Sequence, residues 1–310
     1  MNIKFRMLSV IGGLLLATTF SAHAGARCGS TGVWVQVLGS GGPELNDKRA
    51  SSGYLVWQDG RARILVDMGP GSMLRYEQSG ARIEDLEVVL LTHLHVDHSA
   101  DLPALIKAAF FTERTRDLPI YGPAGNAAMP DTTAFVRSLF AEPGGAYRYL
   151  SGYLTGDEAF LLQPYNVSVA GTAVQQVVEG KNLKITAVSV HHGPIPALAW
   201  RIDIAGRALA FSGDMNGDNH TLPKLAAGAD LLVAHHAIPQ DATGVARNLH
   251  MPPSVIGEIA AEAKVKQLVL SHRMIRTIGR EKESKIEIRK RYKGPLKFAE
   301  DGQCFSVPMR

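Results

Sequence analysis

Short apolar runs bounded by turn residues recur along the chain and predict β-strands. Residues 33–39 read "VWVQVLG", and residues 52–69 hold two further runs on either side of Asp59-Gly60, a dipeptide that favours a hairpin turn. Later runs of the same kind are "LEVVLLTH", "LKITAVSVHH", "ALAWRIDIAGRALAFSGD", "ADLLVAHH" and "VKQLVLSH". Helical periodicity lies between several of them, at residues 101–115, 133–142 and 252–264. Strands and helices mixed in this way predict a layered α/β domain.

Five of these apolar runs end in residue types that bind metal ions. The residues that follow them are His93, the pair His191-His192, Asp214, the pair His235-His236, and His272. Strands aim the residues at their ends into loops, where α/β proteins gather functional groups. If the runs are neighbouring strands, their ends meet at one rim.

The densest group is "HLHVDH", which places His93, His95, Asp97 and His98 within six residues. Imidazole and carboxylate are ligands that zinc prefers. His93 and His95, two apart on an extended segment, can face one ion, and Asp97 and His98 can reach a second ion close to the first. The crowding therefore predicts a two-metal site.

Each ion still needs ligands from distant segments, and His192, Asp214 and His272 are the natural suppliers. Asp214 is able to bridge the ions because a carboxylate has two oxygens. His191 ends the same run as His192. Adjacent residues on a strand face opposite sides, so only one of the two points at the site, and the sequence favours His192.

These segments resemble the metallo-β-lactamase superfamily. "HLHVDH" matches its H-x-H-x-D-H signature, and "VLGSGGP", "ILVDMGPG", "SGD", "HMPP" and "LVLSHRM" follow in the family's order. The resemblance covers nearly all of residues 25–310. It implies an α/β fold of the αββα sandwich type, with two mixed β-sheets flanked by helices and the metal site at one edge of the sheets.

The resemblance also implies roles for single residues. Two Zn²⁺ ions are expected, with iron or manganese as an alternative at one site. The expected ligands are His93, His95 and His192 for the first metal, Asp97, His98 and His272 for the second, and Asp214 shared. Asp97 and His250 are assigned to catalysis. His250, in "NLHMPP", would protonate the leaving group or bind its oxygen.

The expected reaction is hydrolysis of an anionic ester by a metal-bridging hydroxide. Among the superfamily's branches the chain is most similar to exported arylsulfatase-like members, which predicts a sulfate ester or phosphodiester hydrolase acting on a small molecule. A β-lactam or lactone hydrolase and a non-catalytic periplasmic metal- or ligand-binding protein are the alternatives. Ribonuclease Z activity on tRNA is not expected, because the 21 residues between His192 and Asp214 leave no room for that branch's tRNA-gripping arm.

The first residues predict export. Lys4 and Arg6 precede a short apolar stretch that ends in "SAHA", the pattern of a secretory signal peptide covering residues 1–24. Removing Lys4 and Arg6 from the 33 basic side chains leaves 31 against 29 acidic ones, a formal charge of +2. That balance gives no electrostatic reason to expect a nucleic-acid partner. The predicted mature protein is periplasmic or secreted, without stable membrane association, and its oligomeric state stays open.

Three further features have a structural interpretation. Cys28 and Cys304 could form a disulfide in an oxidising compartment or stay as two buried thiols. Residues 126–163 interrupt the strand rhythm, which suggests a helical cap over the metals. Most of its aromatic rings are expected to pack inward, with stacking on an aryl substrate as the alternative hypothesis. Those rings are Phe135, Phe140, Tyr147, Tyr149 and Tyr153. The basic segment 281–294 is predicted to be a surface helix on which Ile286 packs inward.

Overall fold

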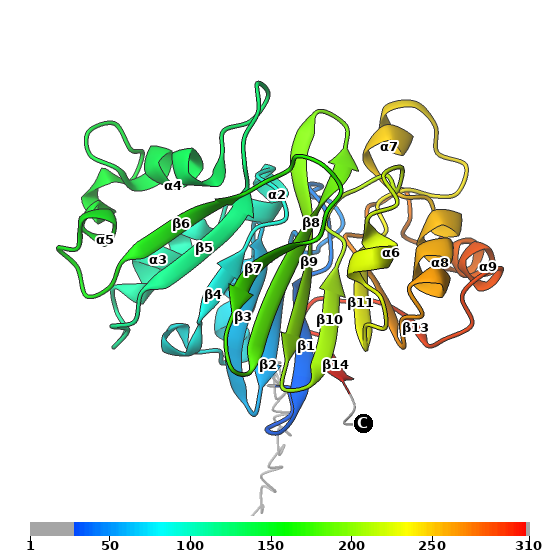
Figure 1. Cartoon of the computed structure of the whole chain (residues 1–310), viewed down its shortest axis with the longest axis horizontal. Coiled ribbons are helices and arrows are strands. Elements are labelled where there is room, and N and C mark those ends of the chain that lie inside the picture. The colour runs from blue at the N-terminus through cyan, green and yellow to red at the C-terminus, as the bar shows by residue number, and fades with distance from the viewer. Residues whose placement is uncertain (1–27, 308–310) are drawn as a thin grey trace, which may run out of the picture.

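Two β-sheets packed face to face form the centre of the protein, and helices cover both outer faces (Figure 1). The computed structural model describes residues 28–307. The predicted signal peptide, residues 1–24, lies outside the described residues. The sandwich confirms the α/β architecture expected from the sequence. Within the described part of the chain, none of the helices is both long and apolar enough to cross a bilayer.

Each sheet has seven strands. The first sheet runs in the order β14 (Cys304–Val307), β1 (Val33–Gly39), β2 (Gly53–Gln58), β3 (Arg61–Met68), β4 (Val88–Leu90), β5 (Leu118–Pro123) and β6 (Leu162–Val167). The second runs in the order β13 (Leu296–Phe298), β12 (Leu268–Ser271), β11 (Leu231–His235), β10 (Arg207–Phe211), β9 (Ile195–Ile204), β8 (Leu183–His192) and β7 (Gln175–Glu179).

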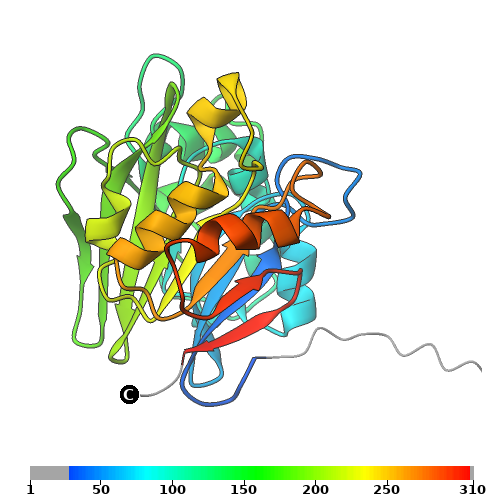
Figure 2. The same cartoon turned by 90° about the vertical axis from the view of Figure 1, so that its right-hand side faces the viewer.

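Helices divide between the two outer faces. Over the first sheet lie α1 (Ser72–Ser79), α3 (Leu102–Ala109), α4 (Thr132–Phe140), α5 (Gly152–Thr155) and the 3₁₀ turns η1 (Ile83–Asp85) and η2 (Arg148–Leu150). Over the second lie α6 (Leu222–Leu225), α8 (Pro253–Glu262) and α9 (Glu281–Arg289), with α8 and α9 in front of the sheet in Figure 2. The short helices α2 (Val96–Ser99) and α7 (Gly244–Leu249) stand at the upper edge in Figure 1.

The alternation along β1 shows why the sequence builds layers. Val33, Val35 and Val37 point into the core between the two sheets. Trp34 and Leu38 belong instead to the core between the first sheet and its helices. Successive strand residues face opposite sides, so one strand with apolar residues on both faces requires a covering layer on each. A third core lies between the second sheet and its helices.

Strand direction brings the predicted site residues to one edge. In the second sheet β10, β11 and β12 are parallel, and β8 and β10 are both antiparallel to β9, so these four strands end at the same edge. In the first sheet β3 and β4 are parallel. The edges of the two sheets are joined there, because Leu198 N donates to Thr92 O at 2.8 Å and Trp200 Nε1 donates to Leu91 O at 3.1 Å.

One sequence expectation about helices needs correction, and another can be made more exact. The side chain of Ile286 on α9 is 54% exposed, and Ile288 is the isoleucine that is buried, because the helix turns its inner face two residues later than expected. Residues 126–163 do form α4, η2 and α5. Phe140 and Tyr153 of this region pack into the outer core of the first sheet, and only Tyr147 and Tyr149 keep exposed rings.

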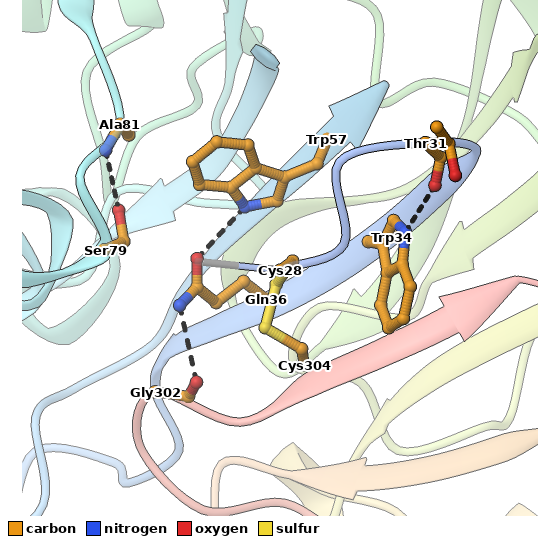
Figure 3. Close-up of a disulfide and its surroundings, with 9 residues drawn as sticks. All are labelled: Cys28, Thr31, Trp34, Gln36, Trp57, Ser79, Ala81, Gly302 and Cys304. Atoms are coloured by element: carbon orange, nitrogen blue, oxygen red, sulfur yellow. Dashed lines mark hydrogen bonds between the residues drawn. A yellow bond between two sulfur atoms is a disulfide. The ribbon is translucent and has the colours of Figure 1, made fainter. Parts of the chain in front are cut away.

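A disulfide joins the two ends of the described chain (Figure 3). Cys28 precedes β1 and Cys304 begins β14, and the bond links residues 276 positions apart. Beside it, Gln36 accepts a hydrogen bond from Trp57 Nε1 at 3.0 Å and donates to Gly302 O at 3.4 Å. Of the two alternatives that the sequence left open, the structure has the disulfide rather than two free thiols.

Candidate metal centre

Three histidines from two sheets converge at the shared edge. His93 and His95 follow β4, and His192 is the last residue of β8. His95 Nδ1 lies 3.1 Å from His93 Nε2 and 3.4 Å from His192 Nε2. Asp214 Oδ2 completes the group at 4.0 Å from His93 Nε2 and 3.8 Å from His192 Nε2. These four atoms form the first set expected from the sequence, and it is the ring of His192 that takes part.

A second set adjoins the first. His272 Nε2 lies 3.1 Å from Asp97 Oδ2 and 3.4 Å from Asp214 Oδ2. His98 Nε2 lies 3.5 Å from Asp97 Oδ2 and 3.7 Å from Asp214 Oδ2. The same oxygen, Asp214 Oδ2, therefore faces both sets. From the sequence, Asp214 was expected to bridge the ions with its two carboxylate oxygens. In the structure a single oxygen, Oδ2, occupies the shared position.

The histidine rings are oriented by partners outside the cluster. His192 Nδ1 donates to Leu249 O at 2.8 Å, and His98 Nδ1 lies 2.8 Å from Asp67 Oδ2. A proton held on Nδ1 by an outer acceptor leaves the lone pair on Nε2 pointing inward, the arrangement usual for metal-binding histidines. This orientation makes both rings available as ligands through Nε2.

Asp67 was not singled out from the sequence. It is fully buried on β3 and accepts from Thr92 N at 2.7 Å and from Thr92 Oγ1 at 2.8 Å, besides contacting His98. Its carboxylate therefore fixes the backbone just before His93 as well as the ring of His98. A lone aspartate inside the apolar run "ILVDM" was the available signal, since a buried carboxylate needs partners.

The sequence placed His235 and His236 at the end of one apolar run without assigning a role to either. His235 Nδ1 lies 2.7 Å from Asp214 Oδ1, the oxygen that does not face the cluster, and its Nε2 lies 3.1 Å from Tyr54 Oη. Burial lowers the pKa of His235 to about 4, so the ring is neutral and donates from Nδ1 to the carboxylate. His236 turns away and contacts Ser284 Oγ at 2.9 Å.

The chemistry of the donor atoms fits metal ions. His98 Nε2 is buried and has no hydrogen-bond partner among the described residues, although it sits among ligand-type atoms. Burial would lower the pKa of His98, but Asp97 and Asp67 raise it well above its ordinary value in the metal-free protein. Burial would raise the pKa of Asp214, yet the surrounding histidines hold it well below its usual range. An ionised carboxylate surrounded by imidazole nitrogens is a site for a dication.

His250 lies beside the cluster, as expected. It follows α7, is 8% exposed, and its Nδ1 stands 3.7 Å from Asp214 Oδ2. Burial lowers the pKa of His250 to about 3, so its ring is neutral at physiological pH. Gly42 packs closely against another expected ligand, His272. A Cβ added at Gly42 would come within 2.8 Å of His272 Cε1.

A family model described as the Beta-lactamase superfamily domain matches residues 62–273, a range that includes all seven expected ligands. The chain belongs to the metallo-β-lactamase superfamily. Among its curated relatives is "Ribonuclease Z" of Mycobacterium sp. (strain KMS), 31% identical over 249 residues that cover 77% of this chain and 83% of the relative. "Ribonuclease Z" of Mycobacterium avium (strain 104) is 28% identical over 284 residues, 86% of this chain and 95% of the relative.

Solved structures of metallo-β-lactamase superfamily members show the same fold. The metallo-beta-lactamase fold protein YhfI from Bacillus subtilis superposes with a TM-score of 0.66 at 23% identity, over 88% of this chain and 98% of that one. Human tRNase Z, short form, superposes with a TM-score of 0.66 at 20% identity, over 89% and 100%. As a superfamily member with hydrolase relatives, the chain is a metal-dependent hydrolase whose His/Asp cluster fits metal binding.

The expectations about substrate and partner were wrong. The sequence favoured an arylsulfatase-like enzyme for small esters, with β-lactam, lactone and binding-protein alternatives, and excluded tRNA and every nucleic acid. Relatives named ribonuclease Z, aligned over most of both chains, overturn that exclusion. The arguments against tRNA, a missing arm and a near-neutral charge, concern how a substrate is gripped. They do not bear on the hydrolytic chemistry of the His/Asp cluster itself.

Proposed function

We propose that this protein is a two-metal phosphodiesterase that cleaves RNA, with tRNA precursors as its substrate class. The observation that carries the proposal is the 31% identity with a ribonuclease Z over 77% of this chain. The shared position of Asp214 Oδ2 between two ligand sets supports it, because phosphoryl hydrolases of this type use two ions a few ångströms apart.

The proposed ligands are those given by the geometry. His93, His95 and His192 would hold one ion, and Asp97, His98 and His272 the other, with Asp214 Oδ2 between them. Two bound Zn²⁺ ions would supply Lewis acidity and a water of lowered pKa. The protein's own contribution is to fix the geometry: Asp67 and His235 hold a ligand ring and the shared carboxylate in place.

His250 would act directly on the substrate. A neutral imidazole with a lowered pKa is a poor source of a full proton and a good hydrogen-bond donor. We assign it to an N–H hydrogen bond onto an oxygen of the scissile phosphate, where negative charge grows as the leaving oxygen departs. Replacing His250 with alanine should leave metal content unchanged and slow the cleavage of diesters with poor leaving groups.

Export is a separate proposal. The disulfide between Cys28 and Cys304 supports folding in an oxidising compartment, as the sequence of residues 1–24 suggests. If both proposals hold, the RNA is met outside the cytoplasm. Fractionation of cells that express the full chain, with an immunoblot for the shortened mature form, tests export without reference to the substrate.

Cleavage of a precursor tRNA with a 3′ trailer tests the function. The zinc-loaded protein should cut the trailer, and an Asp214→Asn variant should not. Bis-nitrophenyl phosphate serves as a small diester that needs no RNA grip. Turnover of the small diester without any cleavage of the precursor would reject RNA as substrate and retain the two-metal phosphodiesterase.

A further inference from the structure

Three exposed aromatic rings surround one ammonium group on the helical side of the first sheet. Lys107 Nζ lies 4.1 Å from the ring centroid of Phe110, 4.9 Å from that of Phe111 and 5.8 Å from that of Tyr149. Phe110 and Phe111 meet edge to face at 5.2 Å. We call these four residues the aromatic platform.

The platform rings are not core residues that happen to reach the surface. Phe110 is 50% exposed, Phe111 75% and Tyr149 65%, whereas the nearby rings of Phe140 and Tyr153 are buried. Burying a phenyl ring stabilises a protein by roughly 1.5–3 kcal/mol, so three rings left in water forgo a large contribution. Grouped exposed rings of this kind mark a binding surface more often than scattered ones.

The platform also carries positive charge that the protein does not neutralise. Neither Lys107 nor Arg148, the residue before Tyr149 in the chain, forms a salt bridge with any residue in the described range 28–307. Both cations are therefore available to an anion. Free cations beside exposed aromatic faces are the combination by which proteins hold single-stranded nucleic acid, with bases on the rings and phosphates on the charges.

We propose that the aromatic platform binds a single-stranded segment of an RNA substrate, with bases stacked on Phe111 and Tyr149 and phosphates paired with Lys107 and Arg148. The proposal rests on the proposed RNA cleavage. Helix α3 connects the two sites: it begins next to Asp101, three residues after His98, and ends at the platform after eight residues, about 12 Å along its axis. A few nucleotides span that length.

The platform would supply the substrate grip that the sequence failed to find elsewhere. Between His192 and Ile195 the chain makes a two-residue turn, so this part of the site edge holds no inserted arm. A single-stranded grip on the helical side would act through stacking, which requires no large net positive charge. This accounts for RNA as a substrate of a chain whose basic and acidic residues nearly balance.

Binding of a fluorescently labelled, single-stranded RNA dodecamer, followed by anisotropy with the chelated protein, tests the platform without cleavage. Base–aromatic stacking is worth roughly 1–3 kcal/mol per base, so a Phe111→Ala/Tyr149→Ala double variant should bind at least about 5-fold more weakly. Lys107→Gln should weaken binding and reduce its salt dependence. Tyr165→Ala is the control, since that ring is 42% exposed and stacks on Tyr121 at 4.8 Å, and no cation of the described residues lies over it.

The zinc-loaded variants should hydrolyse bis-nitrophenyl phosphate at the wild-type rate and cleave precursor tRNA with a raised KM. Unchanged RNA affinity in the double variant overturns the platform, whether or not the wild type cleaves RNA. Loss of self-association or of vesicle binding in that variant, with RNA affinity unchanged, overturns it too by assigning the rings to another partner. Weakened binding together with no RNA cleavage by the wild type supports the platform and rejects the proposed function.

Discussion

Replacing His235 with phenylalanine should loosen the metal centre without touching any expected ligand. Phenylalanine keeps a planar ring in a fully buried position and removes both ring nitrogens. Asp214 Oδ1 then loses the donor that stands 2.7 Å away, and Tyr54 Oη loses its contact at 3.1 Å. The carboxylate shared by both ligand sets would be free to rotate about its Cβ–Cγ bond.

The size of the effect follows from the kind of contact that is lost. Removing an outer partner of a metal ligand typically weakens metal binding by about 10- to 100-fold, equivalent to roughly 1.4–2.7 kcal/mol. Because Asp214 Oδ2 faces both sets, both ions should be affected. The metal-free protein should lose about 1–3 kcal/mol of unfolding free energy, since a buried charged acceptor is left without one of its donors.

Zinc affinity is measured by competition with a chromophoric chelator, and the unfolding free energy by urea titration of the chelated protein. His236→Phe is the matched control. That histidine is the next residue, is equally buried, and contacts Ser284 Oγ rather than the cluster. Its replacement should leave zinc affinity unchanged. Equal zinc affinities for wild type and His235→Phe, or equal losses in the two variants, would refute the assigned role of His235.

Three further predictions concern stability, pH and packing. Cys28→Ser opens a disulfide to Cys304 that spans 276 positions and should cost up to about 5 kcal/mol of unfolding free energy in urea titrations, with hydrolysis per folded molecule unchanged. In the metal-free protein the pKa values of His98 and His272 are raised above 6.5 despite burial, because carboxylates lie beside both rings. The protonated rings therefore stabilise the folded metal-free protein below pH 6.5, the pKa of histidine in the unfolded chain. This stabilisation is lost as the pH rises through the higher pKa values of the folded state. The Tm of chelated protein should therefore fall relative to that of the zinc-loaded form as the pH rises above 6.5, and a constant gap in calorimetry would contradict this. Gly42→Ala places a Cβ 2.8 Å from His272 Cε1 and should reduce zinc content from two ions towards one, which mass spectrometry measures and two retained ions would refute.

Much of the fold and the arrangement of the expected ligands could be predicted from local pattern. Apolar runs ending in His93, Asp214 and His272 become strands, and parallel direction brings their ends together. Alternation predicted that only one of His191 and His192 would face the site, and the structure turns the ring of His192 into the cluster. Pattern is informative here because strand periodicity is strict.

The features that the sequence did not predict depend on strand register or on packing between distant segments. The roles of His235 and His236 alternate in the same way, but which of them faces Asp214 is fixed by how β11 aligns with β10 and β12. Ile288 rather than Ile286 is buried because of where α9 meets α8, a contact that no local window contains. The exclusion of nucleic acid was wrong for a similar reason, since a total charge carries no information on how charges are distributed over the surface.

We propose that two ions share Asp214 Oδ2 at the common edge of the sheets. A crystal structure of the zinc-loaded protein, with anomalous differences recorded at the zinc edge, tests it most directly. Two peaks are expected about 3.5–4 Å apart, with Asp214 Oδ2 within bonding distance of both. One peak should lie beside His93, His95 and His192, and the other beside Asp97, His98 and His272. A single peak, or two peaks that do not share that oxygen, would contradict it.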